Sequence, residues 1–296
     1  MTEPDVKFNR TYTLKVELAA RPPGSPAPGE AGFAVIKLPF SISFEVTRNL
    51  GASANACHLR IYNLDPDSRD RVYRDRYIFD YRAVQLWAGY QGRESLIFNG
   101  NILQAWSFKD SGSEDVITEI EAQESYAMVN AFSNHTQGQQ GYRDILNLLA
   151  KDMPNLGAPQ IGNVPGTTGR GVTLYGNTWR LMQKYTGGSA MTIDNNRLLV
   201  LQPNECLTGS LPTIDATVGL LGSPYRSDNI IEFEMMFTPQ LEVGQQVLLN
   251  SSINRIFNKP YKVVGFQHSG MISPSVEGPA RTLVQLLAGT SAFVPI

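Results

Sequence analysis

Apolar and polar residues alternate along most of the stretch between residues 39 and 65. Apolar side chains occupy every second position from Phe40 to Val46, and the alternation resumes from Cys57 to Tyr62 after a small-residue turn. A period of two is typical of antiparallel strands with one buried face. The stretch therefore predicts two paired strands. Asp65 and Pro66 then predict a helix start, because Asp accepts from free amides and proline needs no partner there.

The same alternation predicts further strands on both sides of this pair. Before the middle of the chain we expect strands at residues 11–18, 33–46, 83–88, 96–108 and 116–123, with a short helix at 66–75. After it we expect strands at 230–237, 246–250, 262–268 and 281–288. Residues 21–32 are rich in proline and glycine, which predicts a mobile loop or an extended arm.

The periodicity changes to a helical one in the middle of the chain. Apolar residues recur at helical spacing between Tyr142 and Leu149. A second helix is expected to begin after Asn177, a suitable N-cap. Residues 190–193 and 198–201 predict a hairpin, because the asparagines of the intervening Asp-Asn-Asn turn tolerate positive φ. These elements together predict a small α+β unit.

The two groups of strands share their order and nearly their spacing. VQLWAG at 84–89 corresponds to QVLLNS at 246–251, FNGNILQAWSF at 98–108 to YKVVGFQHSG at 261–270, and DVITEIEAQ at 115–123 to ARTLVQLLA at 280–288. We interpret the groups as two copies of one antiparallel β unit, although any two β-meanders can resemble each other by chance. The predicted fold is mainly β, with a β domain at 1–135, an α+β domain at 136–226 and a second β domain at 227–296.

Composition limits the possible classes of protein. The 296 residues include 42% hydrophobic and 18% charged residues, enough to bury a core. A net charge of −2 argues against a non-specific nucleic-acid binder. The chain starts without the basic and apolar regions of a signal peptide, so we expect synthesis in a cytosol. Cys57 and Cys206 are expected to be buried free thiols, with a disulfide as the alternative.

Catalytic motifs are missing from the sequence. It contains no His-Glu-x-x-His, Cys-x-x-Cys, nucleophile elbow or P-loop, and we therefore expect no enzyme, no metal and no cofactor. His58 and His268 lie in predicted strands, where a hydrogen-bonded structural histidine is expected. His135 lies in a polar segment that we expect to be a solvent-exposed loop.

Two features could still belong to a glycan-binding or glycan-cleaving site. Glu119 and Glu121 lie on one face of a predicted strand, about 6.6 Å apart by strand rise. That separation suits a glycosidase, but such carboxylates normally come from different strands. Large aromatic residues could line a carbohydrate groove or belong to a core or an interface; they are Trp87, Tyr90, Trp106 and Trp179.

The order of several motifs resembles that of baseplate hub proteins of long-tailed bacteriophages. The motifs of the N-terminal half are FEVTRN, SANACHLRIYNLDPDSRDRVYRD, VQLWAGYQG, LIFNGNI and DVITEIEAQ, and those of the C-terminal half are IIEFEMMFTPQLEVGQQVLLNS and YKVVGFQHSG. The resemblance extends from about residue 37 to residue 287, and the proline-rich segment 21–32 departs from it. No lysozyme or β-helical spike domain is recognisable, so these functions are expected on separate proteins.

The resemblance implies a ring-shaped homotrimer that closes the distal end of the tail tube. Each subunit would contribute two tail-tube-like β-barrel domains flanking the α+β domain. The implied partners are the tail tube protein, the central spike protein and other baseplate proteins, with the tape measure protein and DNA only in transit. The implied location is the virion baseplate, assembled in the host cytoplasm without direct membrane insertion.

A lumen that lets DNA pass should be weakly acidic and polar, because clustered Lys and Arg would bind phosphate. Glu119, Glu121 and Gln123 are the candidate lumen-facing residues. Other readings are the same part in a phage-derived injection particle without a genome, a tail-tip peptidoglycan or glycan hydrolase, and a carbohydrate-binding β protein.

Overall fold

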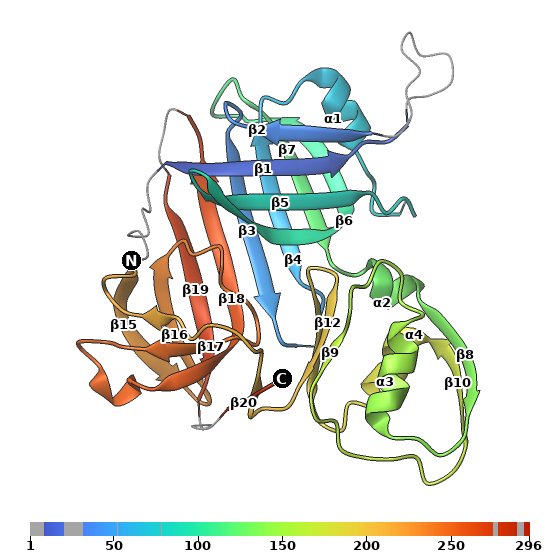
Figure 1. The fold of residues 1–296 in the computed structure, drawn as a ribbon. Coiled ribbons are helices and arrows are strands. Elements are labelled where there is room, and N and C mark those ends of the chain that lie inside the picture. The colour runs from blue at the N-terminus through green and yellow to red at the C-terminus, as the bar shows by residue number, and fades with distance from the viewer. Residues whose placement is uncertain (1–8, 21–31, 52, 78, 275–277, 289–292) are drawn as a thin grey trace.

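A single large, mainly antiparallel sheet dominates the chain (Figure 1). The computed structural model describes residues 9–20, 32–51, 53–77, 79–274, 278–288 and 293–296. The predicted proline-rich arm, except for its last residue, lies outside these ranges. The strands of the sheet are β1 (Arg10–Glu17), β2 (Phe33–Lys37), β3 (Ile42–Asn49), β4 (Ala56–Tyr62), β5 (Ala83–Tyr90), β6 (Arg93–Lys109), β7 (Val116–Gln123), β14 (Thr213–Ile214), β15 (Leu220–Ser227), β16 (Ile230–Met236), β17 (Gln246–Leu249), β18 (Pro260–Ile272) and β19 (Ala280–Leu287).

We call the strands β1–β7 the first β unit and the strands β15–β19 the second β unit. Their order in the sheet is β15-β16-β19-β18-β3-β4-β7-β6-β5-β1-β2. β17 pairs with the first residues of β18, before the stretch that pairs with β3, and β14 pairs with β17. The two units join where β3 pairs with β18, with Val46 opposite His268. Closing the first unit into a barrel would need β3 to pair with β2, but β18 occupies that edge of β3. The sheet is therefore open, and the expectation of closed barrels is wrong.

The sheet curls so that its ends cover its own apolar faces. Figure 1 shows β1, β2 and β5 crossing in front of β3, β4 and β7. The apolar side chains of both layers form one core, which includes Leu14, Phe44 and Ile120. A second core lies on the second β unit and includes Phe233 and Val284, together with Leu201 from the middle of the chain. Burial of these alternate positions is what the predicted period of two requires.

Two local predictions need correction. Residues 33–46 form two strands, β2 and β3, because the chain turns at residues 38–41, where proline cannot continue a ladder. His135 does not lie in an exposed loop but in β8 (Phe132–Gln137), where it contacts Asp152 at 2.7 Å. The alternating polar residues of β8 had concealed a strand, because neither of its faces is strongly apolar.

The predicted helices and hairpin of the middle of the chain are confirmed. Its further elements are α2 (Tyr126–Asn130), α3 (Tyr142–Ala150), β9 (Gln160–Ile161), β10 (Val172–Asn177), α4 (Thr178–Gln183), β11 (Ala190–Asp194), β12 (Arg197–Leu201) and β13 (Glu205–Cys206), followed near the C-terminus by η1 (Arg255–Phe257) and β20 (Val294–Pro295). Asn177 caps α4 by accepting from the Arg180 amide at 3.1 Å. Asn195 and Asn196 both have positive φ in the β11–β12 turn. In the first β unit, Asp65 caps α1 (Pro66–Val72) by accepting from the Ser68 amide at 2.9 Å.

The two β units repeat one strand order. Reading across the sheet, β3-β4-β7-β6-β5 corresponds to β15-β16-β19-β18-β17. One bulge also corresponds, although the β5–β6 and β15–β16 pairs each have an irregularity of their own. β6 carries one extra residue, Leu103, between the partners of the second-last and third-last residues of β7, and β18 carries Val264 at the same place opposite β19. A bulge is a specific feature of a strand pair. The match therefore goes further than the resemblance of any two meanders.

Candidate functional site on the polar face of the sheet

One side of the continuous sheet is polar across both β units, and we call it the polar face. Residues directly opposite each other in an antiparallel pair lie on the same side. One such row runs from Ser269 through Glu45 and His58 to Glu121. Its polar side chains are Ser43, Glu45, Thr47, His58, Arg60, Glu119, Glu121, Gln123, Glu232, Glu234, Gln267, Ser269, Arg281 and Gln285, and Trp106, Met236, Met271 and Leu283 share the face with them.

The three candidate residues of β7 lie together on this face but are not equivalent. Glu119 is only 8% exposed. Its carboxylate lies 2.5 Å from His58 Nε2 and 3.5 Å from Arg60 Nε, both on the neighbouring β4. Glu121 and Gln123 are half-buried. Glu119 is thus a structural acid held by two side chains of β4, whereas Glu121 keeps contact with solvent.

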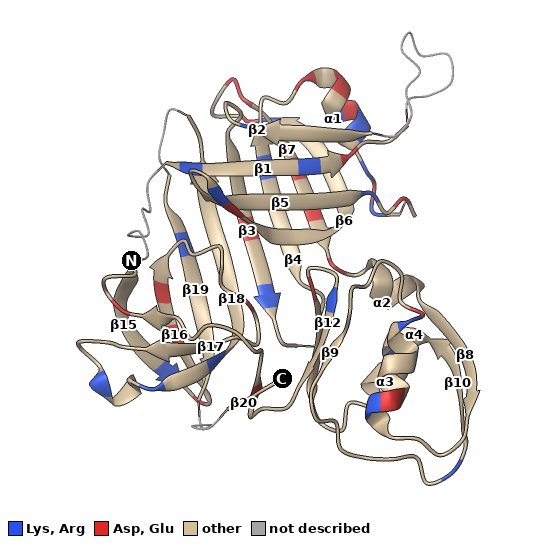
Figure 2. Ribbon diagram, in the orientation of Figure 1, with Lys and Arg blue, Asp and Glu red and all other residues tan. Residues whose placement is uncertain are grey.

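The charges of the polar face are mostly acidic (Figure 2). Five glutamates, Glu45, Glu119, Glu121, Glu232 and Glu234, share it with two arginines, Arg60 and Arg281. Both arginines have an acidic neighbour, since Arg281 lies 2.9 Å from Glu234. The face therefore offers no cluster of free cations that would retain a nucleic-acid phosphate.

The polar face is hollowed where the two β units meet. The hollow has a volume of about 800 Å³ and is lined by side chains of β3, β4, β18 and β19, among them Glu45, Arg60 and Arg281. Glu45 is the one carboxylate among its lining residues, whereas a glycosidase uses two. The hollow is a shallow mixed-charge depression along the seam between the units.

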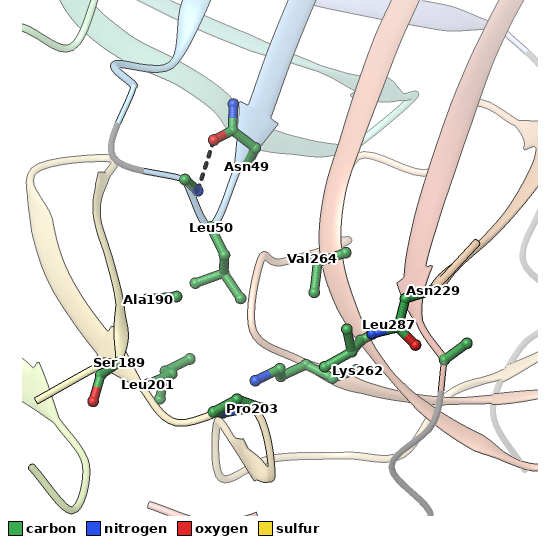
Figure 3. Close-up of a pocket in the computed structure, with 13 residues that line it drawn as sticks. Asn49, Leu50, Ser189, Ala190, Leu201, Pro203, Asn229, Lys262, Val264 and Leu287 are labelled. Carbon is green, nitrogen blue, oxygen red and sulfur yellow. Dashed lines mark hydrogen bonds between the residues drawn. The ribbon is translucent and has the colours of Figure 1, made fainter. Parts of the chain in front are cut away.

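A second, more apolar pocket of about 750 Å³ lies between the sheet and the β11–β12 hairpin (Figure 3). Leu50, Leu201 and Val264 line it, and the amine of Lys262 reaches into it. Lys262 is buried and donates to the Gln202 carbonyl at 2.7 Å. Burial lowers the pKa of Lys262 to about 8, although nearby Glu205 favours its charged form.

A buried polar network fixes the middle of the chain to the sheet. Arg48 of β3 donates through Nε and Nη2 to both oxygens of Asp194, at 2.6 and 2.5 Å. Asn55 donates to Asp194 and to Glu124, and the Asn195 amide donates to Glu124 at 2.9 Å. Burial, together with the charge of Asp194, raises the pKa of Glu124 to about 8.

This network was not predicted, although one sign of it was present in the sequence. The alternation of β3 puts Arg48 on the same face as Phe44 and Val46, and a charged residue on an apolar face needs a buried partner. The partner itself, Asp194, is 146 residues away and could not be chosen from the alternation.

The other residues singled out in the sequence that follow here are buried and have structural roles. His268 is buried, and its Nδ1 lies 2.8 Å from Thr282 Oγ1. Burial, followed by the nearby charge of Arg48, lowers the pKa of His268 to about 3. Cys57 and Cys206 are free and buried, as predicted. Trp179 and Tyr90 are also buried.

Among the residues that the structure places, no three His, Cys, Asp or Glu side chains gather as a metal site requires. No helix in the described ranges is both long and apolar enough to span a membrane.

Comparison with known families identifies the chain. The family model of the baseplate hub gp41 matches residues 27–269, and the chain belongs to this family. A baseplate hub is a structural component of a phage tail. The chain is therefore a structural virion protein that associates with other tail proteins, and it is not an enzyme.

Solved structures share the fold at low sequence identity. The 43 kDa tail protein of prophage MuSo2 from Shewanella oneidensis has a TM-score of 0.59 and 10% identity, over 95% of this chain and 98% of that one. A tail protein from Neisseria meningitidis MC58 has a TM-score of 0.58 and 9% identity, over 95% and 97%. The Escherichia coli c3393 protein, a component of the type VI secretion system, has a TM-score of 0.59 and 10% identity, over 95% and 78%. A comparison with curated proteins gave no match.

Proposed function

We propose that the protein closes the distal end of the tail tube as a ring-shaped homotrimer and joins the tube to the central spike. The observation that carries the proposal is the repeated strand order of the two β units, together with the bulges of β6 and β18 at equivalent places. Two equivalent units in each of three subunits would present six similar elements. A ring of this kind could match a six-subunit tube, because each tube subunit would meet one β unit.

The polar face would line the lumen. Strands of both units contribute to it without interruption, because β3 and β18 pair directly. Its acidic balance would let DNA pass without retaining it, since glutamates repel phosphate and both arginines lie beside glutamates. The middle of the chain, from α2 to β13, would lie outside the lumen as a separate α+β domain between two β domains.

The ring can be tested by co-expression with the tail tube and spike proteins, followed by electron microscopy of the purified complex. A three-subunit annulus with a central hole, seated between tube and spike, is the expected result. A complex that contains the chain as a monomer at the side of the tube would refute the proposal.

The lumen can be tested with glutamates that have no structural role. We expect simultaneous replacement of Glu45 and Glu121 by Lys to slow genome ejection from assembled particles, because phosphate would then bind the wall. Glu119 is a poor target, because its carboxylate also holds His58 and Arg60. Replacement of both glutamates by Gln removes charge without adding cations and is the control. Unchanged ejection kinetics in the lysine variant would mean that the polar face does not line the lumen.

A further inference from the structure

The apolar pocket between the sheet and the β11–β12 hairpin contains the amine of a buried lysine, and we call it the lysine pocket. Leu50, Leu201 and Val264 form apolar walls, and the Lys262 amine points between them (Figure 3). Among the described residues that line the pocket, Lys262 is the only one with a titratable side chain. Its volume of about 750 Å³ is in the usual range of small-molecule sites, which are also mainly apolar with a few placed polar groups.

Lys262 lacks a counter-ion. It is only 2% exposed, and no carboxylate of the described residues lies within ion-pair distance of its amine. Glu205 is close enough for its charge to act on Lys262, but its two oxygens accept from the amides of Asn163 and Gln202, at 2.6 and 2.8 Å. Buried charges in proteins are normally paired. The pocket therefore holds a cation whose partner is not supplied by the described part of the chain.

The amine also has donors to spare. An ammonium group has three N–H groups, and in the described structure one of them donates to the Gln202 carbonyl at 2.7 Å. Burial lowers the pKa of Lys262 to about 8, although Glu205 and Cys206, both of β13, favour its charged form. A carboxylate placed beside the amine would accept from it and stabilise its charge.

The walls of the pocket indicate what the rest of the ligand is. Most of the neighbouring backbone is already paired, since the Leu50 amide donates to the Val264 carbonyl and the Ala288 amide to the Asn229 carbonyl, both at 2.8 Å. β11 and β12 pair with each other along the hairpin. A bound peptide would find few partners for its own amides and carbonyls, which are costly to bury unpaired. An aliphatic chain needs no such partners.

We propose that the lysine pocket binds an aliphatic carboxylate. The carboxylate accepts hydrogen bonds from the Lys262 amine, and the chain lies against Leu50, Leu201 and Val264. The charge-assisted hydrogen bond orients the ligand, and burial of its chain supplies most of the affinity. The ligand contacts both β units and the β11–β12 hairpin, so it holds these three parts together. This site goes beyond the proposed ring and does not depend on it.

Calorimetric titration of the full chain with sodium octanoate at pH 7 tests the site. Octan-1-ol has the same aliphatic body without the charge, and we expect it to bind about tenfold or more weakly than octanoate. Butanoate keeps the charge but buries less apolar surface, and it should also bind more weakly. Equal affinities for octanoate and octan-1-ol, or no binding of octanoate, would overturn the proposal.

A substitution tests the role of the amine. Lys262→Met keeps a long side chain without the charge and should abolish the preference for octanoate over octan-1-ol. Lys259→Met is the matched control, because Lys259 precedes the same strand but lies over the Tyr261 ring, 5.4 Å from its centre, and does not line the pocket. It should keep the full preference. If the Lys262→Met chain also keeps it, the amine does not hold the carboxylate.

The pH dependence of binding tests the same point on the parent chain. Octanoate stays ionised above pH 7, so its affinity should follow the charge of Lys262. With the pKa of this amine at about 8, we expect octanoate affinity to fall about tenfold between pH 7 and pH 9, while the affinity of octan-1-ol stays constant. A flat octanoate profile would refute the pairing. This measurement needs no substitution, so it decides the question even if Lys262→Met does not fold.

Discussion

The buried Arg48–Asp194 pair gives the sharpest prediction about stability. We consider Arg48→Met, which keeps a long side chain but removes the cation. The guanidinium makes two hydrogen bonds to the carboxylate at 2.5–2.6 Å, and both side chains are almost completely buried, at 3% and 0% exposure. Without it, the Asp194 carboxylate would stay in the interior next to the buried Glu124, and the more distant Arg197 guanidinium, at 3.8 Å, would be its remaining ion-pair partner.

Removing one partner of a buried ion pair costs about 3–5 kcal/mol, because the remaining charge loses its compensation. We therefore expect Arg48→Met to lower the free energy of unfolding by about that amount. Adding Asp194→Asn to Arg48→Met should recover part of the loss, because the uncompensated charge disappears. The measured quantity is the interaction energy, which is the difference between the effect of the double substitution and the sum of the effects of the two single substitutions.

Urea titration followed by tryptophan fluorescence and circular dichroism measures these differences. Arg281→Met is the matched control, since its pair with Glu234 has a similar distance of 2.9 Å but both side chains are about half exposed. An exposed pair contributes less than about 1 kcal/mol. If Arg48→Met costs no more than Arg281→Met, or if its effect and that of Asp194→Asn simply add, the network does not fix the hairpin to the sheet.

Two further predictions concern pH and a helix cap. The pKa of Glu124 is raised to about 8, so the folded chain binds its proton more tightly than the unfolded chain, and stability should fall as pH rises toward 8. Buried His268, whose pKa is lowered to about 3, has the opposite effect on stability below about pH 6.5. Between pH 6.5 and 8 Glu124→Gln should therefore flatten the pH dependence of the unfolding midpoint, and an unchanged slope would contradict the burial argument. Asn177→Ala should cost about 2 kcal/mol in urea titration, because it removes the cap of α4 and a donor to the Met128 carbonyl, whereas Asp65→Ala, which removes only an exposed cap, should cost about 1 kcal/mol. Equal costs would show that the amide donor of Asn177 contributes nothing.

The strands, helices and their caps could be predicted because their causes are local. Alternation between Phe40 and Val46 fixes which side chains face the core, and Asp65 and Asn177 accept from amides only three residues away. Catalytic sequence motifs are also short and local, so the sequence alone shows that those named above are missing from it. Alternation failed where no face was apolar, as at His135 in β8, and it did not detect the turn before β3.

The joining of the sheet was decided only by tertiary structure. Val46 lies opposite His268, and Arg48 meets Asp194, across more than a hundred residues of chain. Alternation tells which side chains point inward but not which strand lies alongside, since every edge offers the same amide and carbonyl groups. Because β3 pairs with β18, the strands form one open sheet in place of the expected barrels. The contacts of Glu119 with His58 and Arg60 on the neighbouring strand make it a buried structural acid.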